Sequence, residues 1–261
     1  MSDPKSTSLI RKNLALGELL KLATFDELWA LTGILISQKS DRFFHNGAAR
    51  QKILQFRKLR ALHKVTDSIE AEVCALGSNT IASAFRRGSS VSYDEVVRDV
   101  AKELKVEVRK GGTAPEVEHL LLEVLLSKVL EGKSDQEKEA LRGHGANSID
   151  SAMLSSVRKV AGDTTLASQL LDRLDPIQLS SLLGGKSGLI TSGAVLAVLA
   201  GLRAVPVVGV LGVGVSAVSA LKRTMPALAV IVPAVVQIAF IRRRVINEDY
   251  EKFFTQLRAC L

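Results

Sequence analysis

The sequence predicts an all-α protein in which an N-terminal helical bundle precedes a hydrophobic, Gly-, Ala- and Val-rich C-terminal hairpin or cluster of helices. Two observations predict the bundle: a hydroxyl residue stands three residues before a glutamate at four places, as in helix capping boxes, and apolar residues then recur at helical spacing. A third observation predicts the C-terminal cluster, because residues 176–247 contain no Asp or Glu among their aliphatic residues. The four boxes are Thr24–Glu27, Ser92–Glu95, Thr113–Glu116 and Ser134–Glu137.

We place the bundle at residues 1–146. After Ser92, the residues Val96, Val97 and Val100 share one helical face while charged residues fill the rest, a pattern typical of a helix half-buried on a core. After Thr113, residues 117–130 are apolar on more than one face and predict the central core helix. Residues 105–109 alternatively begin a short strand.

Three further regions follow the bundle. Residues 147–187 predict a connector of short, Ser-rich helices, and residues 188–246 predict apolar, membrane-seeking helices in three pieces, at 188–202, 204–221 and 224–241. Each piece is near the lower length limit for crossing a bilayer. Residues 247–261 predict an amphipathic tail in the cytosol, with Phe253, Phe254 and Leu257 on its apolar side.

The basic charge of the protein is concentrated in the acid-free stretch. The chain has 35 Lys and Arg against 27 Asp and Glu, a net charge of +8. Cations set between aliphatic runs favour a bilayer with anionic lipids, because their long side chains reach the headgroups. The predicted headgroup contacts are Arg203, Lys222, Arg223, Arg242, Arg243 and Arg244.

Small residues recur four apart in this stretch and predict close packing between helices. The two stripes are Gly193, Ala197 and Gly201, and Gly212, Ser216 and Ala220. The alternative is that the apolar pieces form the buried centre of a soluble helical domain, with Pro226 and Pro233 kinking the last piece.

The sequence offers little support for catalysis, and we expect no enzyme activity, cofactor or metal. The segment Gly184–Ser187 lacks the first glycine and the preceding strand of a phosphate-binding loop. The four histidines and two cysteines have no metal-site spacing, and we expect free thiols in a reducing cytoplasm. We expect no nucleic-acid binding, because aromatics make up only 4% of the chain.

A loop before Ser92 has unusual content for a plain connector. Asn79 can cap a short helix bearing Phe85, and Arg86 and Arg87 then either meet an anionic partner or brace the neighbouring acidic helix. This region resembles the YaaW-like family of uncharacterised bacterial proteins, which is similar in profile to the ubiquinol-cytochrome c chaperone domain. The resemblance rests on Leu76-Gly77, Asn79 to Ala82, Phe85-Arg86, Gly88, Val91 to Tyr93 and Leu104 to Val106, and it returns at residues 116–130 and 231–239.

The chain departs from the family pattern at Ser78 and Arg87, where glycines are usual. The resemblance supplies no catalytic residues and implies a bacterial, helical, non-catalytic protein. The leading hypothesis is therefore an assembly or interaction factor whose bundle faces the cytoplasm and whose apolar hairpin engages the inner membrane. Anionic lipids and a membrane-protein client are its expected partners. Two alternatives stay open: a membrane-inserting or pore-forming protein, and a soluble helical scaffold.

Overall fold

The computed structural model describes residues 11–36, 47–78, 91–131, 133–143, 167, 170–171 and 216–260, and these residues are mostly helical with no strand among them. The all-α prediction is confirmed. The helices in chain order are α1 (Leu16–Leu22), α2 (Phe25–Leu35), α3 (Gly47–Lys58), the short 3-10 helix η2 (Leu62–Val65), α4 (Thr66–Ser78), α5 (Tyr93–Glu103), α6 (Ala114–Glu131), α7 (Asp135–Gly143) and α12 (Ser216–Cys260).

The predicted capping boxes start the helices where expected. At Thr24 and Ser92 the hydroxyl accepts the N–H of the glutamate three residues later, and that glutamate accepts the N–H of the cap residue. Ser134 and Glu137 form the same reciprocal pair, and Glu116 accepts the Thr113 N–H at 2.8 Å. Local sequence therefore fixes the starts of these helices. Residues 105–109 follow α5 as a turn and irregular chain, not as a strand.

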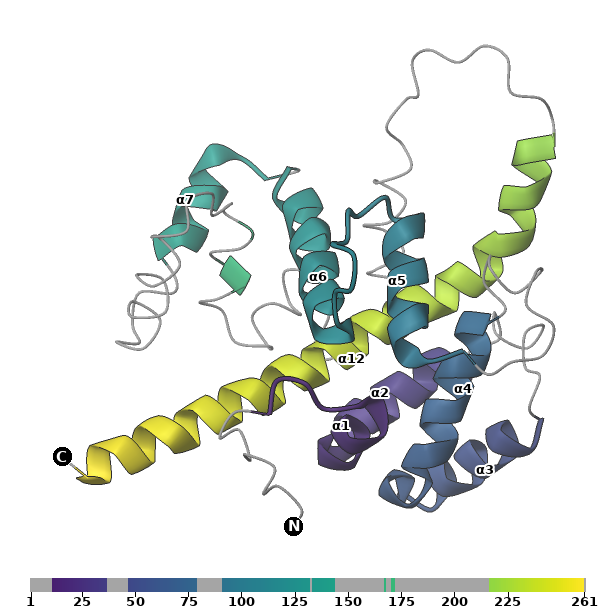
Figure 1. Ribbon diagram of the computed structural model, residues 1–261, viewed down its shortest axis with the longest axis horizontal. Coiled ribbons are helices and arrows are strands. Elements are labelled where there is room, and N and C mark those ends of the chain that lie inside the picture. Colours follow the sequence, from purple (N-terminus) through teal and green to yellow (C-terminus); the bar gives the residue numbers. More distant parts are fainter. Residues whose placement is uncertain are drawn as a thin grey trace.

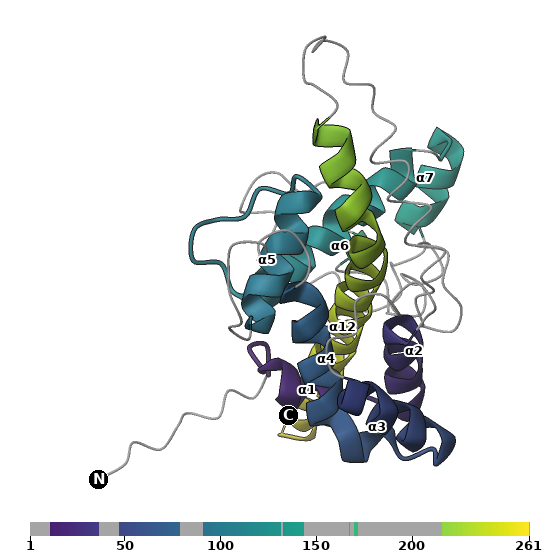
Figure 2. The ribbon, with the colours of Figure 1, turned by 90° about the vertical axis from the view of Figure 1, so that its right-hand side faces the viewer.

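Helix α12 is the axis around which the other helices pack. It contacts α1, α2, α4, α5 and α6, and Figures 1 and 2 show it passing between these helices. Every residue from 230 to 241 is buried, and this segment joins one core with α6, whose Val117, Leu121 and Leu125 are also buried. The expected core helix is therefore present as α6, and α12 is a second helix at the centre of the bundle.

The C-terminal helix is longer than the sequence suggested. Helix α12 has 45 residues and runs through both prolines and through the expected boundary at residue 246. Figure 1 shows it bent in its green part and extending past the bundle in its yellow part. The first two apolar pieces, 188–202 and most of 204–221, lie outside the described residues.

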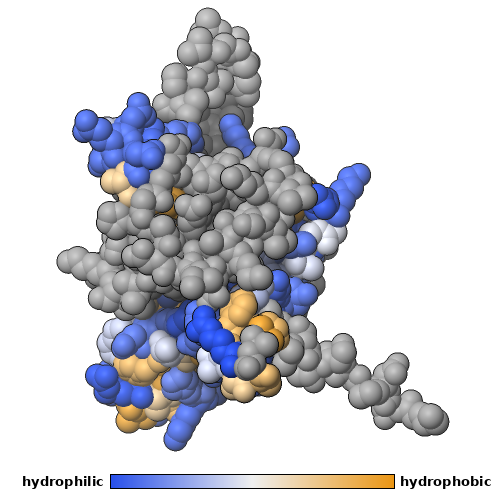
Figure 3. All heavy atoms as spheres, turned by 90° about the vertical axis from the view of Figure 1, so that its left-hand side faces the viewer, coloured by the Kyte–Doolittle hydropathy of each residue, from blue (hydrophilic) through white to orange (hydrophobic). Residues whose placement is uncertain are grey.

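The apolar residues of the described chain are mostly directed inward. On the face in Figure 3 the described surface is largely hydrophilic, with small hydrophobic groups in the lower part of the view. Among the residues described, no helix combines the length and the apolarity needed to cross a membrane.

Helices α4 and α5 pack closely together at Gly77. A Cβ atom built on this buried glycine would overlap the side chain of Val96 on α5. The absence of a side chain therefore permits the contact between the two helices.

We expect Gly77→Ala to lower the free energy of unfolding by roughly 1–3 kcal/mol, because the added methyl group must push α5 away. Urea unfolding followed by circular dichroism measures the effect. Gly47→Ala is the matched control, since a Cβ there meets nothing within 4 Å. A loss of stability no larger for Gly77→Ala than for Gly47→Ala would contradict this account of the packing.

Candidate functional site

The candidate site lies along residues 242–250 of α12, where three segments from the N-terminal half converge on that helix. Each segment is joined to α12 by an ion pair, and the residues that form each pair are 124 to 238 positions apart in the chain. Charged groups in a protein interior need such partners, because leaving water is costly for an isolated ion.

The deepest pair joins α6 to α12. Arg242 donates from Nε to Oε2 of Glu118 at 2.7 Å and from Nη2 to Oε1 at 3.2 Å, and both side chains are almost fully buried. Tyr93 of α5 donates its hydroxyl to Glu118 at 2.9 Å, and Arg242 also donates to the Leu14 carbonyl at 2.7 Å. The network thus connects α5, α6, α12 and the segment before α1.

Burial decides the electrostatics of this network. It raises the pKa of the Glu118 carboxyl, and Arg242 opposes that shift by favouring the carboxylate. Burial also raises the pKa of the Tyr93 hydroxyl well above its ordinary value, and the adjacent Glu118 charge adds to the shift. Tyr93 therefore remains a hydrogen-bond donor to Glu118.

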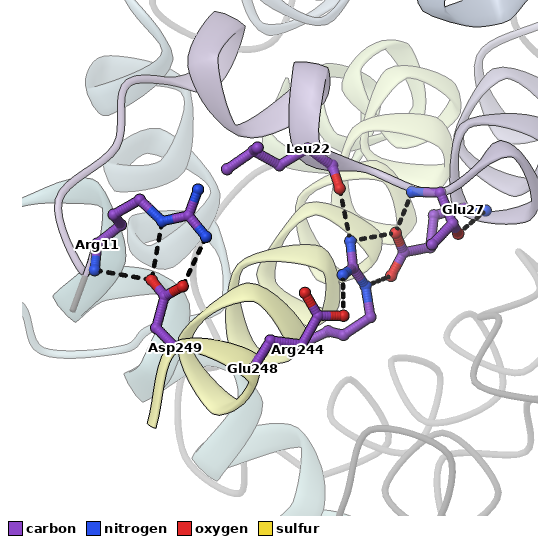
Figure 4. Close-up of polar contacts among 7 residues, drawn as sticks. Arg11, Leu22, Glu27, Arg244, Glu248 and Asp249 are labelled. Carbon is purple, nitrogen blue, oxygen red and sulfur yellow. Dashed lines mark hydrogen bonds and ion pairs between the residues drawn. The ribbon is translucent and has the colours of Figure 1, made fainter. Parts of the chain in front are cut away.

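A second pair joins α2 to α12, as Figure 4 shows. Arg244 donates to both carboxylate oxygens of Glu27, at 2.6 and 2.9 Å, and to the Leu22 carbonyl at 2.9 Å. Glu248 accepts a further bond from Arg244 at 2.5 Å. Glu27 also accepts the Thr24 N–H in the capping box. The same carboxylate therefore caps the N-terminus of α2 and pairs α2 with α12.

The third pair has the opposite polarity, with the acid on α12. Arg11 donates to Asp249 from its backbone N–H at 3.0 Å, from Nε at 2.9 Å and from Nη2 at 2.5 Å (Figure 4). These hydrogen bonds lower the pKa of Asp249, whose side chain is only 4% exposed. The segment before α1 is thereby held along the helix.

A cavity of about 870 Å³ lies beside these pairs. Its wall includes the apolar residues Val108, Leu120, Leu122, Ala239 and Ile246. Cations and acids also line it: Lys12, Arg109, Arg242 and Arg243 against Glu107, Glu116 and Glu118. The cavity therefore places cations beside an apolar wall, and it suits an anionic group attached to an apolar one.

The structure places the predicted headgroup contacts in different environments. Arg242 pairs with Glu118, and Arg244 pairs with Glu27 and Glu248. Two of these acids, Glu118 and Glu27, lie in the N-terminal half of the chain, and Glu248 lies one turn after Arg244 on α12. Arg243 lines the cavity.

The other predicted residues are described in part or not at all. Ser216, Ala220, Lys222 and Arg223 belong to the first turns of α12, of which the structure describes the backbone only. Outside the described residues lie Asn79, Phe85, Arg86, Arg87, Gly193, Ala197, Gly201, Arg203 and Gly212.

Sequence reasoning missed the acidic half of the site. Glu118 interrupts the apolar helix 114–131 next to Val117 and three residues before Leu121, on its buried face. An acid on the apolar face of a helix indicates that a cation is buried beside it, and an arginine within the apolar stretch is the expected cation.

In the described ranges, no group of three His, Cys, Asp or Glu side chains is placed to hold a metal ion.

Away from this site, α4 buries another acid. Glu72 is 1% exposed, and neither of its carboxylate oxygens has a hydrogen-bond partner within the described part of the chain. Burial raises its pKa from 4.5 to about 7, although Arg50 opposes the shift.

We expect Arg242→Met to lower the free energy of unfolding by about 3–5 kcal/mol, because it leaves the Glu118 carboxylate buried without its cation. The double variant Glu118→Gln/Arg242→Met should recover most of that loss, since the amide can still accept the Tyr93 hydroxyl. Glu248→Gln is the control, because Glu248 is exposed and should cost under about 1 kcal/mol. Equal losses in the single and double variants, measured in urea, would contradict the role of the pair.

We expect Glu72 to make stability fall as pH rises. Its folded-state pKa is raised, so its contribution is fully present below pH 4.5 and is lost as pH rises through about 7, by about 3 kcal/mol at most. Glu72→Gln should flatten the fall in unfolding free energy between pH 5 and pH 8. Asp67→Asn, an exposed change on the same helix, should keep the wild-type slope. The same slope in all three proteins would rule out this assignment.

Comparison with known proteins gives one similarity. The chain is 31% identical over 120 residues to a UPF0174 protein from Helicobacter pylori strain J99, a match that covers 46% of this chain and 47% of the relative. The chain therefore spans about half the length of the curated relative that it matches. No protein-family model matches the chain, and no solved structure matches it.

Proposed function

We propose that this protein is a non-catalytic helical interaction factor that works at the surface of an anionic membrane. The observation that carries the proposal is the cavity, in which Arg243 lies with Lys12 and Arg109 beside an apolar wall. A phospholipid headgroup with the start of its acyl chains has the matching chemistry, an anion joined to hydrocarbon. The stretch 176–247 contains further Lys and Arg residues and no Asp or Glu, which also favours contact with an anionic surface.

The assembly role is the finer part of the proposal. It rests on the resemblance of residues 76–106, 116–130 and 231–239 to the YaaW-like family and, more distantly, to the ubiquinol-cytochrome c chaperone domain. A protein of this kind would hold a membrane-protein client near the inner membrane from the cytoplasmic side. The three ion pairs support such a role, because they fix α12 as a rigid element of the bundle.

A second candidate is a helical scaffold without membrane contact. The burial of every residue from 230 to 241 favours it, because that part of the apolar stretch already has protein around it. No observation on the described residues favours the pore-forming alternative.

Flotation of the full chain with vesicles tests the proposal. We expect binding at low salt to vesicles that contain phosphatidylglycerol and little binding to phosphatidylcholine alone, with the bound fraction falling as salt rises. Arg243→Gln should weaken binding about fivefold, for a charge worth about 1 kcal/mol near an anionic surface. Lys102→Gln, which removes an exposed cation of α5, should not. Absence of binding to anionic vesicles would overturn the proposal and leave the scaffold.

A further inference from the structure

A second acid-free segment contributes no residue to the cavity lining. Residues 47–66, which include α3 and η2, contain no Asp or Glu and six cations: Arg50, Lys52, Arg57, Lys58, Arg60 and Lys64. Helix α3 buries only Ala49 and Ile53, so most of its surface faces solvent. Lys52, Lys58 and Lys64 are exposed, and none has an ion-pair partner among the described residues.

Large apolar side chains are exposed beside these cations. Leu59 is 62% exposed and Trp29, the sole tryptophan of the chain, is 40% exposed. Leu22 is 36% exposed, immediately before α2. Three of the four large apolar residues that are exposed in the described chain therefore lie on α1, α2 and the end of α3, and the fourth is Leu257.

Stacked cations join the aromatic residues of α2 to the end of α3, and Leu22 and Leu59 adjoin these residues in the chain. The Arg57 guanidinium lies 3.7 Å from the centre of the Trp29 ring and donates to the Trp29 carbonyl and the Thr32 hydroxyl at 2.5 and 2.6 Å. Arg60 lies 4.7 Å from the centre of the Phe25 ring, and Phe25 and Trp29 are 5.7 Å apart. We call this surface the basic aromatic face: Leu22, Phe25, Trp29, Arg57, Leu59 and Arg60.

We infer that the basic aromatic face is the surface by which the protein docks on an anionic membrane. The inference rests on the proposed function and adds a second contact with the membrane to the cavity that carries that proposal. Tryptophan favours the boundary between headgroups and hydrocarbon, where its ring is in an apolar layer and its N–H is hydrated. Exposed leucines can enter the same layer while neighbouring lysines and arginines meet phosphates.

Charge complementarity supports a lipid surface as the occupant. The exposed cations Lys21 and Lys58 adjoin residues of the face in the chain, and the first turn of α2 carries Asp26 and also Glu27, which is paired with Arg244. A nucleic acid would also attract these cations, but it has no aliphatic layer into which the exposed Leu59 and Leu22 side chains could insert. The combination of leucine, tryptophan and cations therefore favours a headgroup layer.

The fluorescence of Trp29 provides the test, because the full chain has no other tryptophan. We expect vesicles of phosphatidylglycerol and phosphatidylcholine to shift its emission to shorter wavelength, and lipids brominated on their acyl chains to quench it. Lys58→Gln/Arg60→Gln should weaken vesicle binding about 25-fold, for two cations worth about 1 kcal/mol each. The charge-matched control Lys102→Gln/Lys110→Gln, on α5 and the loop after it, should weaken binding much less.

The outcomes separate this inference from the proposed function. Binding to anionic vesicles without a change in Trp29 emission, or equal losses in the two double variants, would overturn the docking face and leave membrane association standing. Absence of vesicle binding would overturn both. A shift of Trp29 emission by single-stranded RNA at lower concentration than by vesicles would overturn the inference in favour of nucleic acid.

Discussion

The buried pair of Glu118 and Arg242 is the contact on which the arrangement of this protein depends. It lies where α5, α6, α12 and the segment before α1 meet, and each of these contributes a donor or acceptor to it. A buried ion pair adds little net stability compared with apolar residues of the same size, but either ion alone is strongly destabilising there. The pair therefore favours one register of α12 against α6, because sliding the helix would separate the charges.

The other two ion pairs also favour one position of α12 against the N-terminal half. Arg244 pairs with Glu27, and Asp249 pairs with Arg11. Along α12 the three paired residues are therefore two arginines followed by an aspartate, and the N-terminal half provides a residue of opposite charge for each. Apolar packing alone would tolerate several placements of a helix rich in valine and alanine. The charges select among them, while the aliphatic residues from 230 to 241 provide the burial.

The local features of the fold could be predicted from the sequence, and the long-range ones could not. Capping boxes at Thr24 and Ser92 and the apolar helix after Thr113 depend on residues three to seven positions apart, which periodicity reveals. Arg242 and Arg244 looked unopposed by other helices because Glu118 and Glu27 lie in the other half of the chain. The continuity of α12 through Pro233 was equally hidden, because only the surrounding helices stabilise a helix that lacks one amide donor.

The length of chain between the paired residues has a consequence for biosynthesis. Partners such as Arg11 and Asp249 are 238 residues apart, so the N-terminal helices leave the ribosome long before α12 exists to complete their core. Until then the sides of α2 and α6 that pack against α12 have no cover, and the nascent chain exposes surfaces that favour aggregation. Chains of this design would gain from slow release or from a holding chaperone during translation.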